Sequence, residues 1–205
     1  MNHNNITSSN IRQENELFNK SWIKKNNLLF DEPIGIDKFK NKSISKIDSS
    51  PMCVVWLKNI DRLLNLIPKY YDLKNYHFID IGCGSGISTI YFKKNYNFKT
   101  YSGVDFEKKF IEYSEINKKN SSTDNIQFSI EDVTYLKLQD KPYFLFLFNP
   151  FGLKTIKFFI KNNFQNLKKK SSIIGYVNDL HINHFTDYDV QIVRDDFYNI
   201  SFIGF

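Results

Sequence analysis

Hydrophobic residues along this chain fall into two patterns. Short continuous apolar runs alternate with stretches in which apolar residues recur every three or four positions. The first pattern is typical of strands buried on both faces, and the second is typical of helices that cover a sheet. The expected strands are 78–81, 100–105, 126–132, 143–150 and 171–179, and the expected helices among them are 85–95, 106–119 and 154–167.

The order of these elements predicts the fold class. Strands that alternate with helices form parallel βαβ units, and two further runs, 189–194 and 199–205, are typical of a terminal antiparallel pair. We therefore expect an α/β protein with a doubly wound, Rossmann-like seven-stranded sheet, mostly parallel with an antiparallel C-terminal strand. Such a sheet binds ligands at the carboxyl ends of its parallel strands.

The chain ahead of the first strand is less regular. Its first 45 or so residues are polar and rich in Asn and Lys. Apolar positions that include Phe18 and Trp22 predict a helix over 14–29, and 30–39 has the composition of a loop. These large aromatic residues would be unfavourable in a solvated tail, so we expect this arm to pack on the rest of the protein.

A stronger helix is predicted from Ser50 to Ile67. Ser50 is a suitable cap, Pro51 fits the first helical position, and Pro68 ends the helix. We therefore divide the chain into an N-terminal arm or lid, residues 1–49, and a domain, residues 50–205.

Composition and charge narrow the class of protein. No apolar run approaches the roughly 20 residues needed to cross a bilayer, and the N-terminus lacks the features of a signal peptide, so a cytoplasmic protein is expected. The formal charge is +6, but only three of the 28 basic residues are Arg. Because Arg is the usual reader of phosphates and base edges, we attribute the charge to a biased composition and find no sequence-specific nucleic-acid module. The expected assembly is a monomer or a homodimer.

The most informative stretch is HFIDIGCGSG, which begins at His77. An apolar run broken by Asp80 leads into glycines at positions 82, 84 and 86. A buried strand followed by such a loop and a helix brings backbone close to a nucleotide. The dinucleotide fingerprint G-x-G-x-x-G would need a third glycine where this chain has Ile87.

The acids fall at the ends of the next two strands. Asp105 ends the second expected strand, about twenty residues after Gly86, and Asp132 ends the third. The motif acid-x-G-x-G-x-G with these acids resembles class I S-adenosylmethionine-dependent methyltransferases, and the resemblance extends from residue 77 to about 180. Within that superfamily the chain is most similar to small uncharacterised bacterial methyltransferases that have a G-[IV]-D segment, here Gly35-Ile36-Asp37, and an LFLFNPFG-like fourth strand, here Leu145–Gly152.

The resemblance implies a role for each site residue. Asp105 would accept from both ribose hydroxyls, Asp132 from the adenine amine, and Asp80 would orient the methionine amino end. Gly82 and Gly84 would let the ligand approach the backbone closely, because a Cβ at either position would clash with it. The implied cofactor is S-adenosyl-L-methionine, and its implied binding residues are Asp80, Gly82, Cys83, Gly84, Asp105, Phe106, Asp132, Val133 and Asn149.

The segment Asn149-Pro150-Phe151-Gly152 bears on the acceptor. Amino-methyltransferases of bases and glutamine use [DN]-P-P-[FYW], whereas this chain has one proline and its aromatic residue comes one position early. Asn149 is therefore a candidate for the methyl-transfer pocket or for a cap on the next helix. If the acceptor needs a general base, His181 and His184 follow the fifth strand and are candidates, although a core or surface role is the favoured explanation for each.

No cluster of side chains has metal-ligand spacing, so a metal-independent enzyme is expected. We expect a methyltransferase whose acceptor is a small-molecule or glycan hydroxyl. The alternatives are N-methylation of a protein or RNA amine, with non-SET histone lysine methyltransferases as a related case, or a silent module that only binds the cofactor. A nicotinamide-dependent oxidoreductase is disfavoured by Ile87 and Asp132.

Overall fold

The computed structural model of this chain describes residues 8–29 and 33–205. Its centre is one seven-stranded sheet with the strand order β3-β2-β1-β4-β5-β7-β6. The first five strands pair in parallel, and β7 pairs antiparallel with both β5 and β6. The strands are β1 (His77–Ile81), β2 (Thr100–Asp105), β3 (Ile126–Ile130), β4 (Tyr143–Phe148), β5 (Ile173–Val177), β6 (Gln191–Asp195) and β7 (Ile200–Gly204). The predicted fold class is confirmed.

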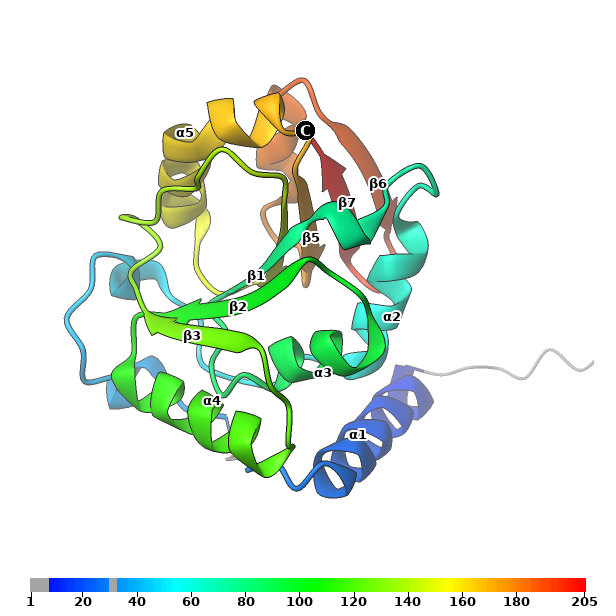
Figure 1. Cartoon of the computed structure of the whole chain (residues 1–205), viewed down its shortest axis with the longest axis vertical. Helices are drawn as coiled ribbons and strands as arrows, with labels where there is room; N and C mark the ends of the chain where they lie inside the picture. Colours follow the sequence, from blue (N-terminus) through cyan, green and yellow to red (C-terminus); the bar gives the residue numbers. More distant parts are fainter. Residues whose placement is uncertain (1–7, 30–32) are drawn as a thin grey trace, which may run out of the picture.

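Helices cover both faces of this sheet. On one face lie α2, α3 and α4, with α1 packed outside α2, and on the other face lies α5 (Figure 1). The helices are α1 (Ser8–Lys25), α2 (Leu57–Leu66), α3 (Ile87–Asn95), α4 (Lys108–Asn120) and α5 (Leu153–Lys169). Short 3-10 turns are η1 (Ile36–Lys38), η2 (Ser45–Asp48), η3 (Leu73–Asn75) and η4 (Ile182–Asp187). No helix in the described part of the chain is long and apolar enough to cross a membrane.

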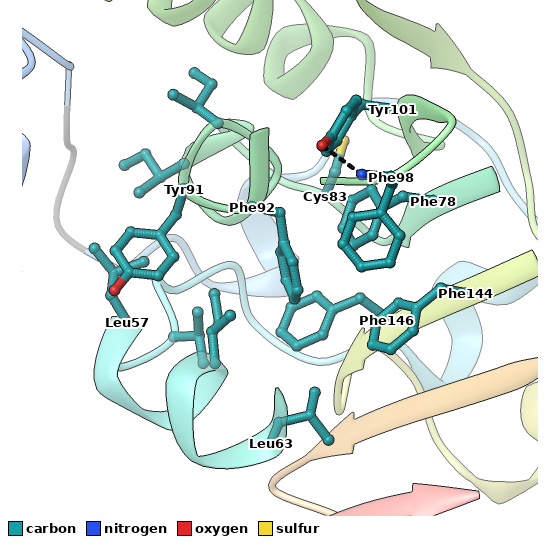
Figure 2. Packing of buried hydrophobic residues seen from close by; sticks show 14 of the residues in the cluster. Leu57, Leu63, Phe78, Cys83, Tyr91, Phe92, Phe98, Tyr101, Phe144 and Phe146 are labelled. Atoms are coloured by element: carbon teal, nitrogen blue, oxygen red, sulfur yellow. Dashed lines mark hydrogen bonds between the residues drawn. The ribbon is translucent and has the colours of Figure 1, made fainter. Parts of the chain in front are cut away.

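Aromatic residues fill the layer between the sheet and α3. Phe78 on β1 and Phe144 on β4 stack with ring centroids 6.0 Å apart, and Phe92 of α3 packs on both rings (Figure 2). Phe98 joins them, and its backbone N–H donates to the Tyr101 hydroxyl over 2.7 Å. Offset and edge-on ring pairs of this kind add to the stabilisation that burial provides. This core holds β1 and β4 rigidly side by side.

The predicted helix start at Ser50 is wrong, because α2 begins at Leu57. Ser50 and Met52 lie in extended chain, where the Ser50 N–H donates to the Pro150 carbonyl and Met52 forms a bridge with Ile34. The cap comes instead from α1, since the Asn19 side-chain oxygen accepts from the Leu57 N–H over 2.9 Å. Asn19, which lies 38 residues before Leu57, thus caps α2 in place of the predicted cap Ser50.

The first helix also differs from its predicted span of 14–29, since it ends at Lys25. Asn27 has a φ of +55°, and the N–H groups of Asn27 and Leu28 donate to the carbonyls of Lys24 and Ile23. This is a Schellman ending with Asn in the left-handed position. Leu28 is consequently turned back into the core rather than extending the helix.

The topology directs attention to the carboxyl ends of the parallel strands. The chain order reverses at β1, which has β2 on one side and β4 on the other. Open α/β sheets bind ligands in the crevice outside the strand ends at such a switch point.

Candidate functional site

A cleft opens at the carboxyl ends of β1, β2 and β4. Its lining includes the glycine loop, the end of β2 and the turn after β4. Seven of the nine residues expected to hold a cofactor line it: Asp80, Gly82, Cys83, Gly84, Asp105, Phe106 and Val133. Asp132 and Asn149 do not line it.

The glycine loop forms the floor of the cleft with backbone alone. Gly82 and Gly84 have φ values of +74° and +52°, which side chains rarely adopt. A Cβ on Gly82 would lie 2.5 Å from Cβ of Pro150, and one on Gly84 would lie 3.1 Å from Cγ of Met52. The loop therefore packs closely against neighbouring chain, and its N–H groups at residues 82–84 donate to Val104 and Asp105.

Two buried carboxylates lie beside this loop. Asp105 accepts hydrogen bonds from the backbone N–H groups of Gly84 (3.0 Å) and Glu107 (2.9 Å), and Asp80 accepts from the hydroxyls of Ser88 (2.6 Å) and Thr89 (2.7 Å). Burial raises the pKa of each carboxyl group to about 6, against the hydrogen bonds that favour the charged form. The cleft thus concentrates negative charge at its floor, which favours a cationic ligand.

One wall of the cleft is apolar and aromatic. Phe106 at the end of β2 packs edge-on against Phe39, which in turn meets Phe110 of α4 at 5.2 Å between ring centroids. Met52 completes this cluster. Of these four residues the sequence interpretation named only Phe106, because Phe39 and Met52 come from irregular chain whose position no local pattern reveals.

Residues 33–56, which we name the covering segment, lie across the cleft. Glu107, only 2% exposed, accepts from the backbone N–H groups of Lys40 (2.8 Å) and Asn41 (2.9 Å). The side-chain amide of Asn41 donates a hydrogen bond to the carbonyl of Phe106 over 3.0 Å. This segment was expected to be in part a loop and in part a helix, and it is instead an ordered cover fastened to the end of β2.

Asp132 fastens the same segment at a second point. One carboxylate oxygen accepts from the Ser43 hydroxyl and from the N–H groups of Ile44 and Ser45, and the other accepts from Thr134. Desolvation alone would raise the pKa of Asp132, but these hydrogen bonds outweigh it and lower the pKa to about 2. Its lone pairs are thus engaged by the protein, and the neighbouring Glu131 lines the cleft instead.

The segment after β4 holds the covering segment at a third point. Asp48 accepts from the N–H of Thr155 (3.1 Å) and from its hydroxyl (2.5 Å), so it caps α5 from a distance. A Cβ on Gly152 would meet the Asp48 carboxylate at 2.9 Å, and the Gly152 N–H donates to the Asp48 carbonyl. Asn149 is therefore not the cap of α5; its side-chain oxygen accepts from the Tyr176 hydroxyl over 3.1 Å.

The two histidines lie away from the cleft. His181 precedes η4 and lines none of the described hollows. His184 lies beside α5, where its ring pairs with the Tyr188 hydroxyl at 3.2 Å, and burial is the main cause that lowers its pKa. The structure therefore does not bring either candidate base to the strand ends that line the cleft.

A second cavity adjoins the cleft on the β4 side. It lies at the ends of β4 and β5 and against the turn between β6 and β7, with Phe148, Val177 and Asn199 among its lining residues. Cys53, Val54 and Phe148 line both spaces. Because β4, β5 and β7 follow β1 in the sheet, the cavity continues the cleft along the same sheet edge.

Known proteins share this architecture. A sequence profile described as a methyltransferase domain matches residues 72–187, more than half of the chain. No curated protein sequence matches it.

Among solved structures, a putative RNA methyltransferase from Pyrococcus horikoshii is 13% identical with a TM-score of 0.54, over 82% of this chain and 92% of that chain. The ribosomal protein L11 methylase from Lactobacillus delbrueckii subsp. bulgaricus is 14% identical with a TM-score of 0.50, over 72% and 77%. A putative methyltransferase from Streptococcus mutans, in complex with SAH, is 11% identical with a TM-score of 0.49, over 75% and 100%. At these identities the likeness concerns the fold.

Proposed function

The chain belongs to the methyltransferase-domain family and is an S-adenosylmethionine-dependent methyltransferase, and from this premise we propose that the cleft at the ends of β1 and β2 binds the cofactor. The observation that carries the proposal is the pair of buried carboxylates beside a glycine floor. Asp80 and Asp105 supply negative charge where a ligand with a sulfonium and an amino group needs it. The peptide groups of residues 82–84 supply the close contact.

The residues of the cleft fit the parts of this cofactor. Asp105 uses one lone pair of each oxygen within the protein and keeps capacity to accept from ribose hydroxyls. Phe39 and Phe106 offer an aromatic wall for adenine, with the Val133 backbone beside it. Because Asp132 is engaged by Ser43–Ser45, we propose that it positions the cover over the adenine side in addition to any contact with the adenine amine.

The protein contributes mainly position and shielding. When bound, the cofactor supplies an electrophilic methyl group on a positively charged sulfur. The covering segment and the Pro150 turn close the cleft around it, which removes water and fixes the direction of attack. The open side faces the second cavity, so we propose that the acceptor approaches from the β4–β5 side, next to Asn149.

We propose a hydroxyl group of a small molecule or glycan as the acceptor. The second cavity adjoins the cleft through shared residues, which supports an acceptor that enters it as a whole or by one terminal unit. N-methylation of a protein or RNA amine and a silent cofactor-binding module are the alternatives. Activity assays distinguish the three alternatives. Methylation of compounds in a panel of hydroxyl acceptors supports the first, methylation of compounds in a panel of amines supports the second, and turnover with neither panel supports the silent module.

Titration calorimetry tests the cofactor site. We expect the protein to bind S-adenosylmethionine and not NAD, and Asp105→Ala to weaken binding by at least about tenfold, because it removes hydrogen bonds to a charged group of roughly 1.5–3 kcal/mol each. The exposed Asp124→Ala is the matched control and should keep the wild-type affinity. A folded Asp105→Ala protein with unchanged affinity would refute the assignment of Asp105.

A further inference from the structure

The second cavity has an aromatic wall at the edge of the hydrophobic core. Trp56 and Phe148 are half-buried there, Tyr198 lies beside them, and Phe197 is 68% exposed at the β6–β7 turn. Large rings gathered around an open hollow of about 580 Å³ are typical of ligand sites rather than of packing. Flat apolar walls favour an occupant that is itself flat.

Two amide side chains give this cavity a defined hydrogen-bonding character. The side-chain oxygen of Asn59 accepts from Nη1 of Arg62 over 2.5 Å, and that of Asn199 accepts from Nη2 of Arg194 over 3.0 Å. A guanidinium group only donates, so these contacts fix which end of each amide is the oxygen. No hydrogen bond within the described residues uses the Nδ2 group of either amide, so both keep N–H donors for an occupant.

The cavity also lacks a base. None of the described residues that line it is Asp, Glu, His, Lys or Arg. Cys53 lines it, but burial raises the pKa of this thiol and keeps it protonated. Arg62 lies behind Asn59 and 3.9 Å from the centre of the Tyr198 ring. Arg194, behind Asn199, is itself paired with Asp179 and Asp196.

From these features we propose that the second cavity binds the methyl acceptor, and that this acceptor is a planar aromatic ring bearing a hydroxyl group. The inference rests on the proposed function and narrows its acceptor. The ring stacks on the aromatic wall, and its oxygen accepts from Asn199, with Asn59 as a second donor. The same oxygen faces the Cys53–Phe148 side, where the cavity meets the cofactor cleft.

The absence of a base from the described lining residues is what selects an aromatic hydroxyl over a sugar hydroxyl. A phenolic group ionises near pH 10 in water, and an aliphatic hydroxyl does so only several units higher. The N–H donors of Asn199 and Asn59 stabilise an aryl oxide, so the hydroxyl proton is lost to solvent without a protein base. The oxide oxygen then forms a bond to the methyl carbon as the carbon–sulfur bond breaks, with its electron pair left on a now neutral sulfur.

Fluorescence titration tests this proposal with 7-hydroxycoumarin, an aromatic hydroxyl whose emission reports ionisation. With S-adenosylhomocysteine present, we expect the wild-type protein to bind it and to favour its ionised form at pH 7. The Asn199→Asp variant keeps the acceptor for Arg194 but replaces the N–H donor with a charged oxygen. We expect it to bind the probe at least about tenfold more weakly, since a charge-assisted donor is replaced by a like charge.

Two controls accompany this variant. Asn183→Asp makes the same substitution at an exposed position of η4 outside the cavity and should bind the probe normally. With S-adenosylmethionine present, wild-type protein should methylate 7-hydroxycoumarin but not decahydro-2-naphthol, a saturated two-ring alcohol of similar size.

The results of these experiments distinguish failure of the proposed function from failure of the aromatic-acceptor proposal. Failure to bind S-adenosylmethionine would overturn the proposed function itself. If the cofactor binds, three results would each overturn the aromatic acceptor: no binding of 7-hydroxycoumarin, equal binding by wild type and Asn199→Asp, or equal methylation of the saturated alcohol. Weaker binding by Asn199→Asp alone, with cofactor affinity unchanged, supports it.

Discussion

The pKa values of three aspartates at the sheet edge are shifted in two opposite directions. Burial raises the pKa of Asp80 and of Asp105 to about 6, so each contributes most stability below pH 4 and loses that contribution as pH rises through 6. Asp132, with a pKa of about 2, contributes stability above pH 4 and loses it as pH falls through 2. At neutral pH the first two are charged at a cost to folding, which is what a site for a cation requires.

This arrangement predicts that cofactor binding releases protons near pH 6. A bound cation favours the charged form of Asp80 and Asp105, so their pKa falls and protons leave. We expect the calorimetric heat at pH 6 to vary with the ionisation enthalpy of the buffer, and the affinity to rise between pH 5 and pH 7.5. Asp80→Asn should reduce the number of protons released; a binding heat independent of the buffer at pH 6 would contradict the role of these groups.

At the scale of elements, the covering segment behaves as one unit held at three points. Glu107 holds residues 40 and 41, Asp132 holds residues 43–45, and the Asp48–Thr155 contact holds the end next to the Pro150 turn. Apart from η1, η2 and the backbone bridge between Ile34 and Met52, this segment has no regular structure of its own, so these side chains contribute to its order. Glu107 and Asp132 follow β2 and β3, whereas Asp48 belongs to the covering segment itself.

Removing one fastening should therefore loosen one part of the cover. In Glu107→Ala, the N–H groups of residues 40 and 41 lose a charged acceptor, which costs about 1.5–3 kcal/mol for each hydrogen bond. We expect amide exchange at these two residues to accelerate by at least about tenfold while α4 keeps its protection. Glu112→Ala, an exposed position on the same helix, is the control. Equal exchange in both variants would show that Glu107 does not hold the cover.

At the scale of the whole molecule, the cleft is built from parts far apart in the chain. Its floor comes from β1 and β2, its cover from residues 33–56, and its far wall from the turn after β4. The start of α2 depends on Asn19 of α1, which also donates to the Val55 carbonyl over 2.8 Å. The predicted division at residue 49 stays a prediction, and close contacts connect its two sides.

A ligand that joins these parts should stabilise all of them together. At a free concentration about 100 times Kd, S-adenosylmethionine should add about 2.7 kcal/mol. For a chain of this size each kcal/mol raises the melting temperature by roughly 2–4 °C, so we expect an upward shift of about 5–10 °C in a calorimetric scan. NAD at the same concentration is the control, and an equal shift with NAD would contradict a cleft specific for this cofactor.

Local sequence was sufficient for the regular part of the fold. The five parallel strands, the antiparallel end and the glycine loop follow from apolar runs and from glycines, because each signal acts within a few residues. Seven expected cofactor residues, such as Gly82 and Asp105, line one cleft for the same reason: strand ends of a parallel sheet meet at one edge. Their roles toward the cofactor remain predictions that the calorimetry above addresses.

Tertiary structure decided what the strand ends contact. Ser50 and Pro51 have the local chemistry of a helix start, yet pairing with Pro150 and Ile34 keeps this stretch extended, and Asn19 starts α2 instead. Likewise, no local pattern shows that Asp132 holds the covering segment or that arginines orient the amides of the second cavity. The sequence by itself determined the sheet and its glycine floor, whose signals are short-range. The covering segment and the second cavity depend on partners tens of residues apart, and only packing brings these together.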